Sequence, residues 1–113
     1  MRDGESESER LPGGFAMRLR EDGDSRVVEI SGELDLAHST EVENAFAEAE
    51  KAEGPIVVDL TGLTFLDSVG VAILLMARGR DRQDGGSRVT FVAPTRENVM
   101  QVLVRTGTDV ELF

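Results

Sequence analysis

The sequence predicts a single small α/β domain with a mixed, mostly parallel sheet, and three observations support this prediction. Segments rich in β-branched residues alternate with segments of helical periodicity along most of the chain. A chain of 113 residues can bury one hydrophobic core but not two. The longest apolar stretch, residues 71–77, is far shorter than the ~20 residues that cross a membrane. Alternating strands and helices favour parallel strands joined by right-handed crossovers.

The chain changes character at Phe15. Residues 1–14 combine charge, serine and glycine and are expected to form a disordered acidic tail, so the folded domain is expected to span 15–113. Apolar and polar residues alternate over 15–20, and a β-branched segment follows at 26–32 after turn-forming residues. These two segments are expected to pair as a β-hairpin.

A helix and a buried strand are expected next. Residues 39–54 carry apolar side chains at three- and four-residue spacing opposite an acidic face, which is the pattern of an amphipathic helix. Thr40 and Glu43 have the spacing of a capping box for its first turn. The β-branched run at 55–62 is typical of a strand that is buried on both faces.

The second half of the chain continues this alternation. A second helix is expected over 68–83, a further buried strand over 87–93, and a third helix after Pro94. Residues 109–113 are expected to form a short last strand. The predicted order is therefore β-β-α-β-α-β-α-(β).

The composition narrows the classes of partner and cofactor. With 22 acidic and 12 basic residues, the net charge is −10, which disfavours nucleic acid and membrane surfaces and favours a basic protein partner. Cysteine is absent and histidine occurs once, so disulfides and metal sites built from thiolates or several imidazoles are not expected. No cofactor is indicated. No secretory signal is visible, and we expect a cytoplasmic protein.

Polar residues follow the predicted parallel strands. The strands that end near Leu34 and Leu60 are followed by loops that carry Asp35 and, further on, Asp67 with Ser68. The carboxyl ends of parallel strands meet at one edge of a sheet, where binding sites of open α/β sheets gather. We therefore expect these three polar side chains at an accessible edge.

Asp67 and Ser68 head an apolar helix, and two interpretations of this pair remain open on local grounds. Both residue types are favoured at helix N-termini, where their oxygens accept hydrogen bonds from free backbone N–H groups. The same N–H groups and the helix dipole also suit a phosphate, so Ser68 is a candidate phosphorylation site. Gly70 is expected to leave the approach to this serine uncrowded.

Enzymatic interpretations of these residues find little support. A hydrolase nucleophile at Ser68 requires glycine two residues earlier, where Leu66 stands. Phosphoryl transfer to Asp59, as in a receiver domain, requires a lysine late in the chain, but Lys51 is the only lysine. We expect Asp59 to bond the following turn and His38 to be a solvated surface histidine. The protein is not expected to be an enzyme.

Four segments in the same order resemble the STAS domain family, and in particular its small bacterial anti-sigma-factor antagonists. They are VVEISGELDL, VVDLTGLTFLDSVGVAILL, GGSRVTFVAP and VLVRTGTD. The resemblance covers residues 15–113 and includes the G-E-L-D turn and the D-S-x-G helix start. It implies a small sheet with helices mainly on one face.

The resemblance also implies a mechanism. Dephosphorylated antagonists bind an anti-sigma factor that is also a serine kinase, and this binding frees the sigma factor. Phosphorylation of the D-S-x-G serine, here Ser68, abolishes binding, and a PP2C-type phosphatase restores it. The partner-binding residues implied are Asp35, Asp67, Ser68, Val69 and Gly70, with exposed apolar side chains from Val69 onward. Val69 departs from the pattern, because a small polar residue often follows the serine.

Two alternatives to the phosphorylation switch remain. One is a STAS scaffold or transport-associated interaction module that binds another partner without phosphorylation. The other is a regulatory domain that binds a nucleotide at the helix N-terminus, although neither a glycine-rich phosphate loop nor a base-stacking aromatic is visible.

Overall fold

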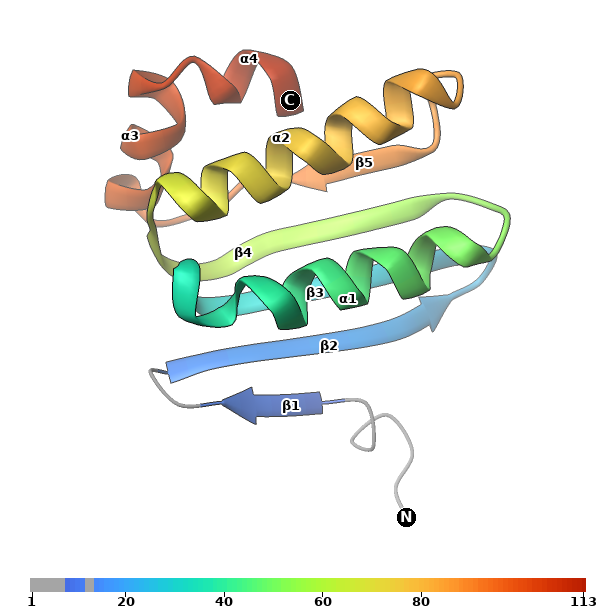
Figure 1. The fold of residues 1–113 in the computed structure, drawn as a ribbon, viewed down its shortest axis with the longest axis horizontal. Coiled ribbons are helices and arrows are strands. Elements are labelled where there is room, and N and C mark those ends of the chain that lie inside the picture. Colours follow the sequence, from blue (N-terminus) through green and yellow to red (C-terminus); the bar gives the residue numbers. More distant parts are fainter. Residues whose placement is uncertain (1–7, 12–13) are drawn as a thin grey trace.

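The computed structural model describes residues 8–11 and 14–113, and within them one mixed five-stranded sheet has the order β1-β2-β3-β4-β5 (Figure 1). The strands are β1 (Ser8–Leu11), β2 (Phe15–Asp22), β3 (Ser25–Leu34), β4 (Ile56–Leu66) and β5 (Val89–Val92). The helical elements are the 3₁₀ turn η3 (Leu36–His38), α1 (Ser39–Lys51), α2 (Ser68–Gln83), α3 (Glu97–Arg105) and α4 (Thr108–Leu112).

The topology confirms the predicted α/β class and the main order of elements. Strands β1, β2 and β3 pair antiparallel, whereas β3, β4 and β5 pair parallel, as the crossovers through α1 and α2 require. The β2–β3 hairpin turns at Gly23, whose φ of 62° lies in the left-handed region that favours glycine. Among the described residues, no helix combines the length and the apolar character needed to span a membrane.

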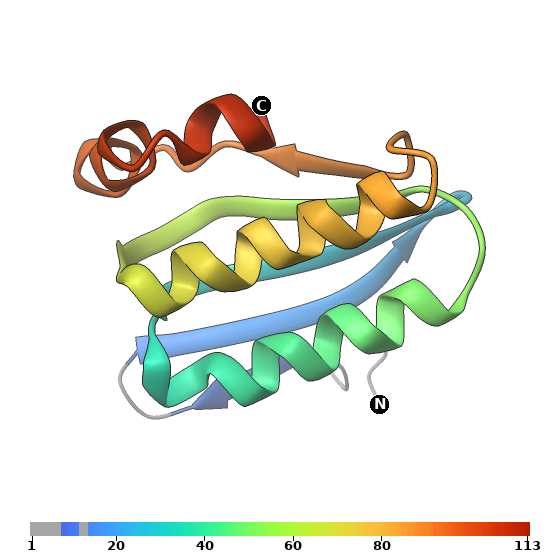
Figure 2. The same cartoon turned by 45° about the horizontal axis from the view of Figure 1, so that its top comes forward.

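The helices α1 and α2 lie side by side on one face of the sheet, while α3 and α4 lie at its β5 end (Figure 2). Alternation along the strands directs one set of side chains into the core beneath the helices. In β3, Val28 and Ile30 are buried there, whereas Glu29 between them pairs with Arg20 of β2 at 2.7 Å. This hydrogen bond to Glu29 raises the pKa of the Arg20 guanidinium.

Strand β4 is longer than predicted, since it continues past Leu60 to Leu66. Its pairing with β3 shifts register twice, which accommodates extra residues without ending the strand. At the first shift, Asp59 Oδ1 accepts hydrogen bonds from the backbone N–H of Thr61 at 2.9 Å and from its hydroxyl at 2.7 Å. The expected structural role of Asp59 is therefore confirmed. Strand β4 ends at Leu66, immediately before Asp67.

The prediction of a disordered tail is wrong for Ser8–Leu11, which form β1. This strand pairs antiparallel with β2, because the outer edge of β2 offers unpaired backbone groups. Residues 1–7 and 12–13 of the predicted tail lie outside the described residues.

Two expectations about helix ends are also wrong. The capping box of Thr40 and Glu43 does not form, because the 3₁₀ turn η3 leads into α1 without a side-chain cap, and Asp35 caps that turn instead. Residues 109–113 do not form a strand: the chain enters α4 through Gly107, whose φ is 73°. Leu112 of α4 is buried in the core, so the helix packs its apolar side against the domain.

A buried ion pair fastens the C-terminal part of the fold. Asp81 of α2 is 3% exposed; its Oδ2 accepts from Arg78 at 2.9 Å, and its Oδ1 accepts from the backbone N–H groups of Arg88 and Val89 at 3.1 and 3.2 Å. Arg78 also donates to the carbonyls of Val89 and Leu112, each at 3.1 Å. The pair therefore joins α2, β5 and α4, and it occupies backbone groups on the outer edge of β5.

Candidate functional site

The loops after β3 and β4 meet at one edge of the sheet. Asp67 Oδ2 accepts a hydrogen bond from the backbone N–H of Leu36 at 3.3 Å, and the N–H of Asp67 donates to the carbonyl of Leu34 at 3.3 Å. Asp35 lies between these two residues of the β3 loop and is partly exposed. The structure thus brings Asp35, Asp67 and Ser68 to neighbouring loops, because β3 and β4 are parallel neighbours.

Asp67 is the N-cap of α2. Its Oδ1 accepts from the N–H of Gly70 at 2.9 Å, and its carbonyl accepts the first helical hydrogen bond from Val71 at 3.0 Å. The N–H groups of Ser68 and Val69 have no partner within the helix, as at any helix start. The capping role therefore belongs to Asp67 and does not require Ser68.

Ser68 is exposed at the first position of α2. Within residues 8–11 and 14–113, its hydroxyl makes no hydrogen bond. An exposed hydroxyl at a helix N-terminus is accessible to a modifying enzyme, and a phosphate attached there would lie near unpaired N–H groups.

Gly70 is buried, and its missing side chain points inward. A Cβ at this position would lie 2.7 Å from the carbonyl oxygen of Leu34 and 2.6 Å from Cδ1 of Leu66. Glycine therefore allows α2 to pack closely on the ends of β3 and β4. The expectation that Gly70 clears the approach to Ser68 is wrong, because the space it leaves is on the core side of the helix.

Replacing Gly70 by alanine is expected to lower the free energy of unfolding by about 1–3 kcal/mol, because the methyl group overpacks a site bounded by backbone. Denaturant unfolding followed by circular dichroism measures this change. Gly79→Ala is the matched control: Gly79 lies in the same helix, and a Cβ added there would have no neighbour within 4 Å. This control is expected to stabilise the protein by about 0.5–1 kcal/mol. Similar effects of the two substitutions would contradict the close approach at Gly70.

The apolar run that follows Ser68 divides between two faces of α2. Val71, Ile73, Leu74 and Ala77 are buried, as expected of a core helix. The outer face carries Ala72, Leu75, Met76 and Gly79, which are exposed and which we call the α2 stripe. Their spacing of three and four residues places them on one helical face that begins beside Ser68. Val69 is half-buried and packs against the core.

An exposed apolar side chain also lies in the loop next to the start of α2. Leu36, in the loop hydrogen-bonded to Asp67, is 68% exposed. Helix α1 lies beside α2 (Figure 2) and is joined to it by the pair between Glu50 and Arg80 at 3.0 Å. The candidate partner surface therefore combines the apolar α2 stripe with the partly exposed carboxylates of Asp35 and Asp67.

The prediction that His38 is a solvated surface residue is wrong. His38 is 5% exposed, and its ring stacks on that of Phe15 with centroids 4.5 Å apart and planes 7° apart. Its Nδ1 lies 3.0 Å from Asp35 Oδ1 and 3.1 Å from the carbonyl oxygen of Glu33. The 3₁₀ turn before α1 brings this side chain inward, and no periodicity in the sequence signals that turn.

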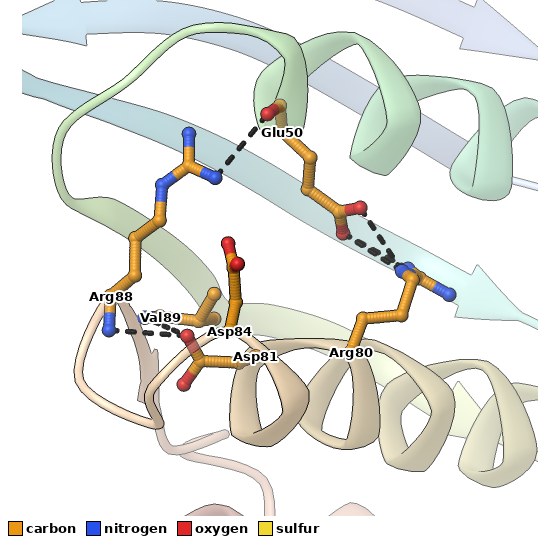
Figure 3. Close-up of a pocket in the computed structure, with 6 residues that line it drawn as sticks. All are labelled: Glu50, Arg80, Asp81, Asp84, Arg88 and Val89. Atoms are coloured by element: carbon orange, nitrogen blue, oxygen red, sulfur yellow. Dashed lines mark hydrogen bonds and ion pairs between the residues drawn. The ribbon is translucent and has the colours of Figure 1, made fainter.

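A cavity of about 190 Å³ lies at the other end of α2 (Figure 3). It is lined by Glu50, Arg80, Asp81, Asp84, Arg88 and Val89. Arg80 pairs with the Glu50 carboxylate at 3.0 Å, and Arg88 donates to the Glu50 carbonyl at 3.3 Å. At 1.5 Å per helical residue, Asp81 is ~20 Å from Ser68. These charged groups join α1, α2 and the loop before β5, and they form no part of the candidate site.

The fold defines a small α/β domain in which Asp35, Asp67 and Ser68 lie at the carboxyl ends of two parallel strands. The family model described as "Mlab, STAS domain" matches residues 17–112. The chain therefore belongs to the STAS domain family. The comparison with curated protein sequences yields no significant match.

Several solved structures share this fold. An anti-sigma factor antagonist from Mycobacterium paratuberculosis has a TM-score of 0.76 at 23% identity, over 92% of this chain and 87% of that chain. The Bacillus cell fate determinant SpoIIAA in its phosphorylated form has a TM-score of 0.63 at 21% identity, over 86% and 88%. The STAS domain of an antisigma-factor antagonist from Rhodobacter sphaeroides has a TM-score of 0.50 at 28% identity, over 70% and 84%. Anti-sigma factor antagonists are thus among the structural neighbours.

Proposed function

We propose that this protein is an anti-sigma factor antagonist controlled by phosphorylation of Ser68. In its dephosphorylated form it binds an anti-sigma factor with serine kinase activity, and the sigma factor is released. The observation that carries the proposal is the exposed hydroxyl of Ser68, which does not cap α2 and which directly follows Asp67, whose side chain is hydrogen-bonded to the loop of Asp35. The protein acts as a binding module and not as an enzyme.

The switch is electrostatic. A phosphate on Ser68 adds about 1.5–2 negative charges. The unpaired N–H groups at the start of α2 stabilise the phosphate, so the modified protein remains folded. Asp67 and the nearby Asp35 already make this edge negative, and a partner that tolerates the neutral hydroxyl is then repelled. A PP2C-type phosphatase reverses the modification.

The partner contacts the loop edge and the α2 stripe together. The apolar side chains of Leu75 and Met76, 37% and 51% exposed, supply area that is removed from water on binding. The Asp35 and Asp67 carboxylates at the loop edge favour a partner surface that adds basic groups to an apolar patch. Asp35, Asp67, Ser68 and Val69 belong to this surface, whereas Gly70 acts by positioning the helix start.

Incubation with a candidate anti-sigma factor kinase and ATP, followed by mass mapping, tests the site. We expect one phosphate on Ser68 in the wild-type protein and none in Ser68→Ala. The substitution removes an exposed hydroxyl, so the variant is expected to keep the fold, which circular dichroism checks. A phosphate on any other residue would contradict the assignment of Ser68.

A STAS scaffold or transport-associated module without a phosphorylation switch is the second candidate. It is favoured by the description of the matching family model, which names Mlab. This candidate predicts that the protein binds its partner while Ser68 stays unlabelled by every kinase tested. Binding that is unaffected by a negative charge at Ser68 would also favour it.

A further inference from the structure

The buried imidazole of His38 faces two hydrogen-bond acceptors from the loop that leads to the candidate site. Nδ1 lies 3.0 Å from a carboxylate oxygen of Asp35 and 3.1 Å from the carbonyl oxygen of Glu33. Neither atom can donate a proton, so Nδ1 carries the hydrogen and acts as the donor. His38 thereby ties the Glu33 carbonyl to the interior of the domain, and the Asp35 carboxylate lies beside the same N–H.

The direction of this N–H is set by the core. The His38 side chain is 7% exposed, and its ring lies flat against Phe15, which is 0% exposed at the start of β2. A rotation of the imidazole would break the stack and would bury its polar atoms without partners, which costs free energy. The ring therefore holds its donor in one orientation.

The loop that contains Asp35 is hydrogen-bonded to the helix start that carries Ser68. Asp35 Oδ1 accepts a hydrogen bond from the N–H of Ala37 at 3.1 Å and also lies 3.0 Å from His38 Nδ1. The next residue, Leu36, donates its N–H to Asp67 Oδ2, and Asp67 caps α2 at Gly70. The backbone of residues 33–36 and the hydrogen bonds at its two ends thus connect the buried imidazole to the helix start that carries Ser68.

We propose that His38 is a positioning residue for the candidate site: its Nδ1–H, bonded to the Glu33 carbonyl and 3.0 Å from the Asp35 carboxylate, holds the loop of residues 33–36 against the N-terminus of α2. Its effect on partner binding rests on the proposed function, whereas its effect on the loop does not. Loss of the donor is expected to loosen the loop locally and to leave helix α2 intact.

Two substitutions of His38 test the hydrogen-bond donor and the aromatic ring separately. His38→Phe keeps an aromatic ring for the stack on Phe15 but lacks the donor. His38→Asn loses the ring but places an amide N–H at the same distance along the side chain as Nδ1. Amide hydrogen exchange of the free protein, measured by NMR, reports on the Leu36 N–H. The amide of Val71, within α2, serves as the internal reference.

We expect the Leu36 amide to exchange about tenfold faster in His38→Phe than in the wild type, since an anchored hydrogen bond is lost. In His38→Asn its exchange should stay within about threefold of wild type, and the Val71 amide should be unchanged in both. If His38→Phe does not fold, Asp35→Ala removes the carboxylate beside Nδ1 together with its bond to the Ala37 N–H, and it should give at least the same increase. A Leu36 amide that exchanges at the wild-type rate in the variant that folds would overturn the proposal. An equal loss of protection at Leu36 in His38→Asn and His38→Phe would also overturn it.

Partner affinity then tests the functional consequence. His38→Phe is expected to bind the anti-sigma factor about three- to tenfold more weakly than wild type, and His38→Asn is expected to bind like wild type. If the wild-type protein itself binds no such kinase, the proposed function fails, while the exchange of the Leu36 amide still decides the role of His38.

Discussion

Replacing Asp81 by alanine is expected to lower the free energy of unfolding by about 3–5 kcal/mol. The substitution leaves Arg78 as an uncompensated, largely buried charge and removes the acceptor for the N–H groups of Arg88 and Val89. Because small domains have a total stability of only about 5–15 kcal/mol, this loss is a large fraction of the whole. Urea unfolding followed by circular dichroism measures the change.

The control for this prediction is Asp84→Ala. Asp84 lies just after the same helix and is exposed, so its substitution should change stability by less than about 0.5 kcal/mol. Asp81→Asn keeps an acceptor for the backbone N–H groups but removes the charge. Its free energy of unfolding should therefore lie between those of Asp81→Ala and Asp84→Ala. Equal stability of Asp81→Ala and Asp84→Ala would show that the ion pair does not hold β5 and α4 in place.

Ser68→Asp is expected to weaken binding to the anti-sigma factor at least about tenfold, which corresponds to about 1.4 kcal/mol. The added carboxylate lies beside Asp67 and near Asp35, and like charges brought together at an interface cost several kcal/mol. Its single charge is smaller than that of a phosphate, so the phosphorylated protein should bind more weakly still. Isothermal titration calorimetry or surface plasmon resonance measures the affinities.

Two controls separate this local effect from the change in net charge. Ser68→Ala should bind within about twofold of wild type, because the hydroxyl is exposed and does not cap the helix. Ser87→Asp adds the same charge in the exposed loop before β5, at the far end of α2 and beyond the Debye length of about 8–10 Å. Ser87→Asp should therefore also bind like wild type. Equal affinities of Ser68→Asp and Ser68→Ala would contradict the electrostatic switch.

Part of the candidate site could be predicted from the local sequence pattern. The order of strands and helices places the loops of Asp35 and Asp67 at one edge of a parallel sheet, and the structure has both loops there. Asp67 before an apolar helix predicts a cap, and the cap is present. Local pattern does not distinguish Asp67 from Ser68 as the capping residue, because both side chains carry acceptors suited to a helix start.

The sequence by itself determined the elements whose formation depends on neighbouring residues. Periodicity places α1, α2 and the central strands, and cap chemistry places the start of α2 at Asp67–Ser68, since these effects act over a few residues. Only the tertiary structure decided that His38 is buried, that Gly70 faces inward and that residues 109–112 lie in a helix. In each of these cases the contacts come from distant segments: Phe15 beneath His38, Leu34 against Gly70, and Arg78 at the carbonyl of Leu112. Such contacts exist only after the chain has folded, so no local pattern encodes them.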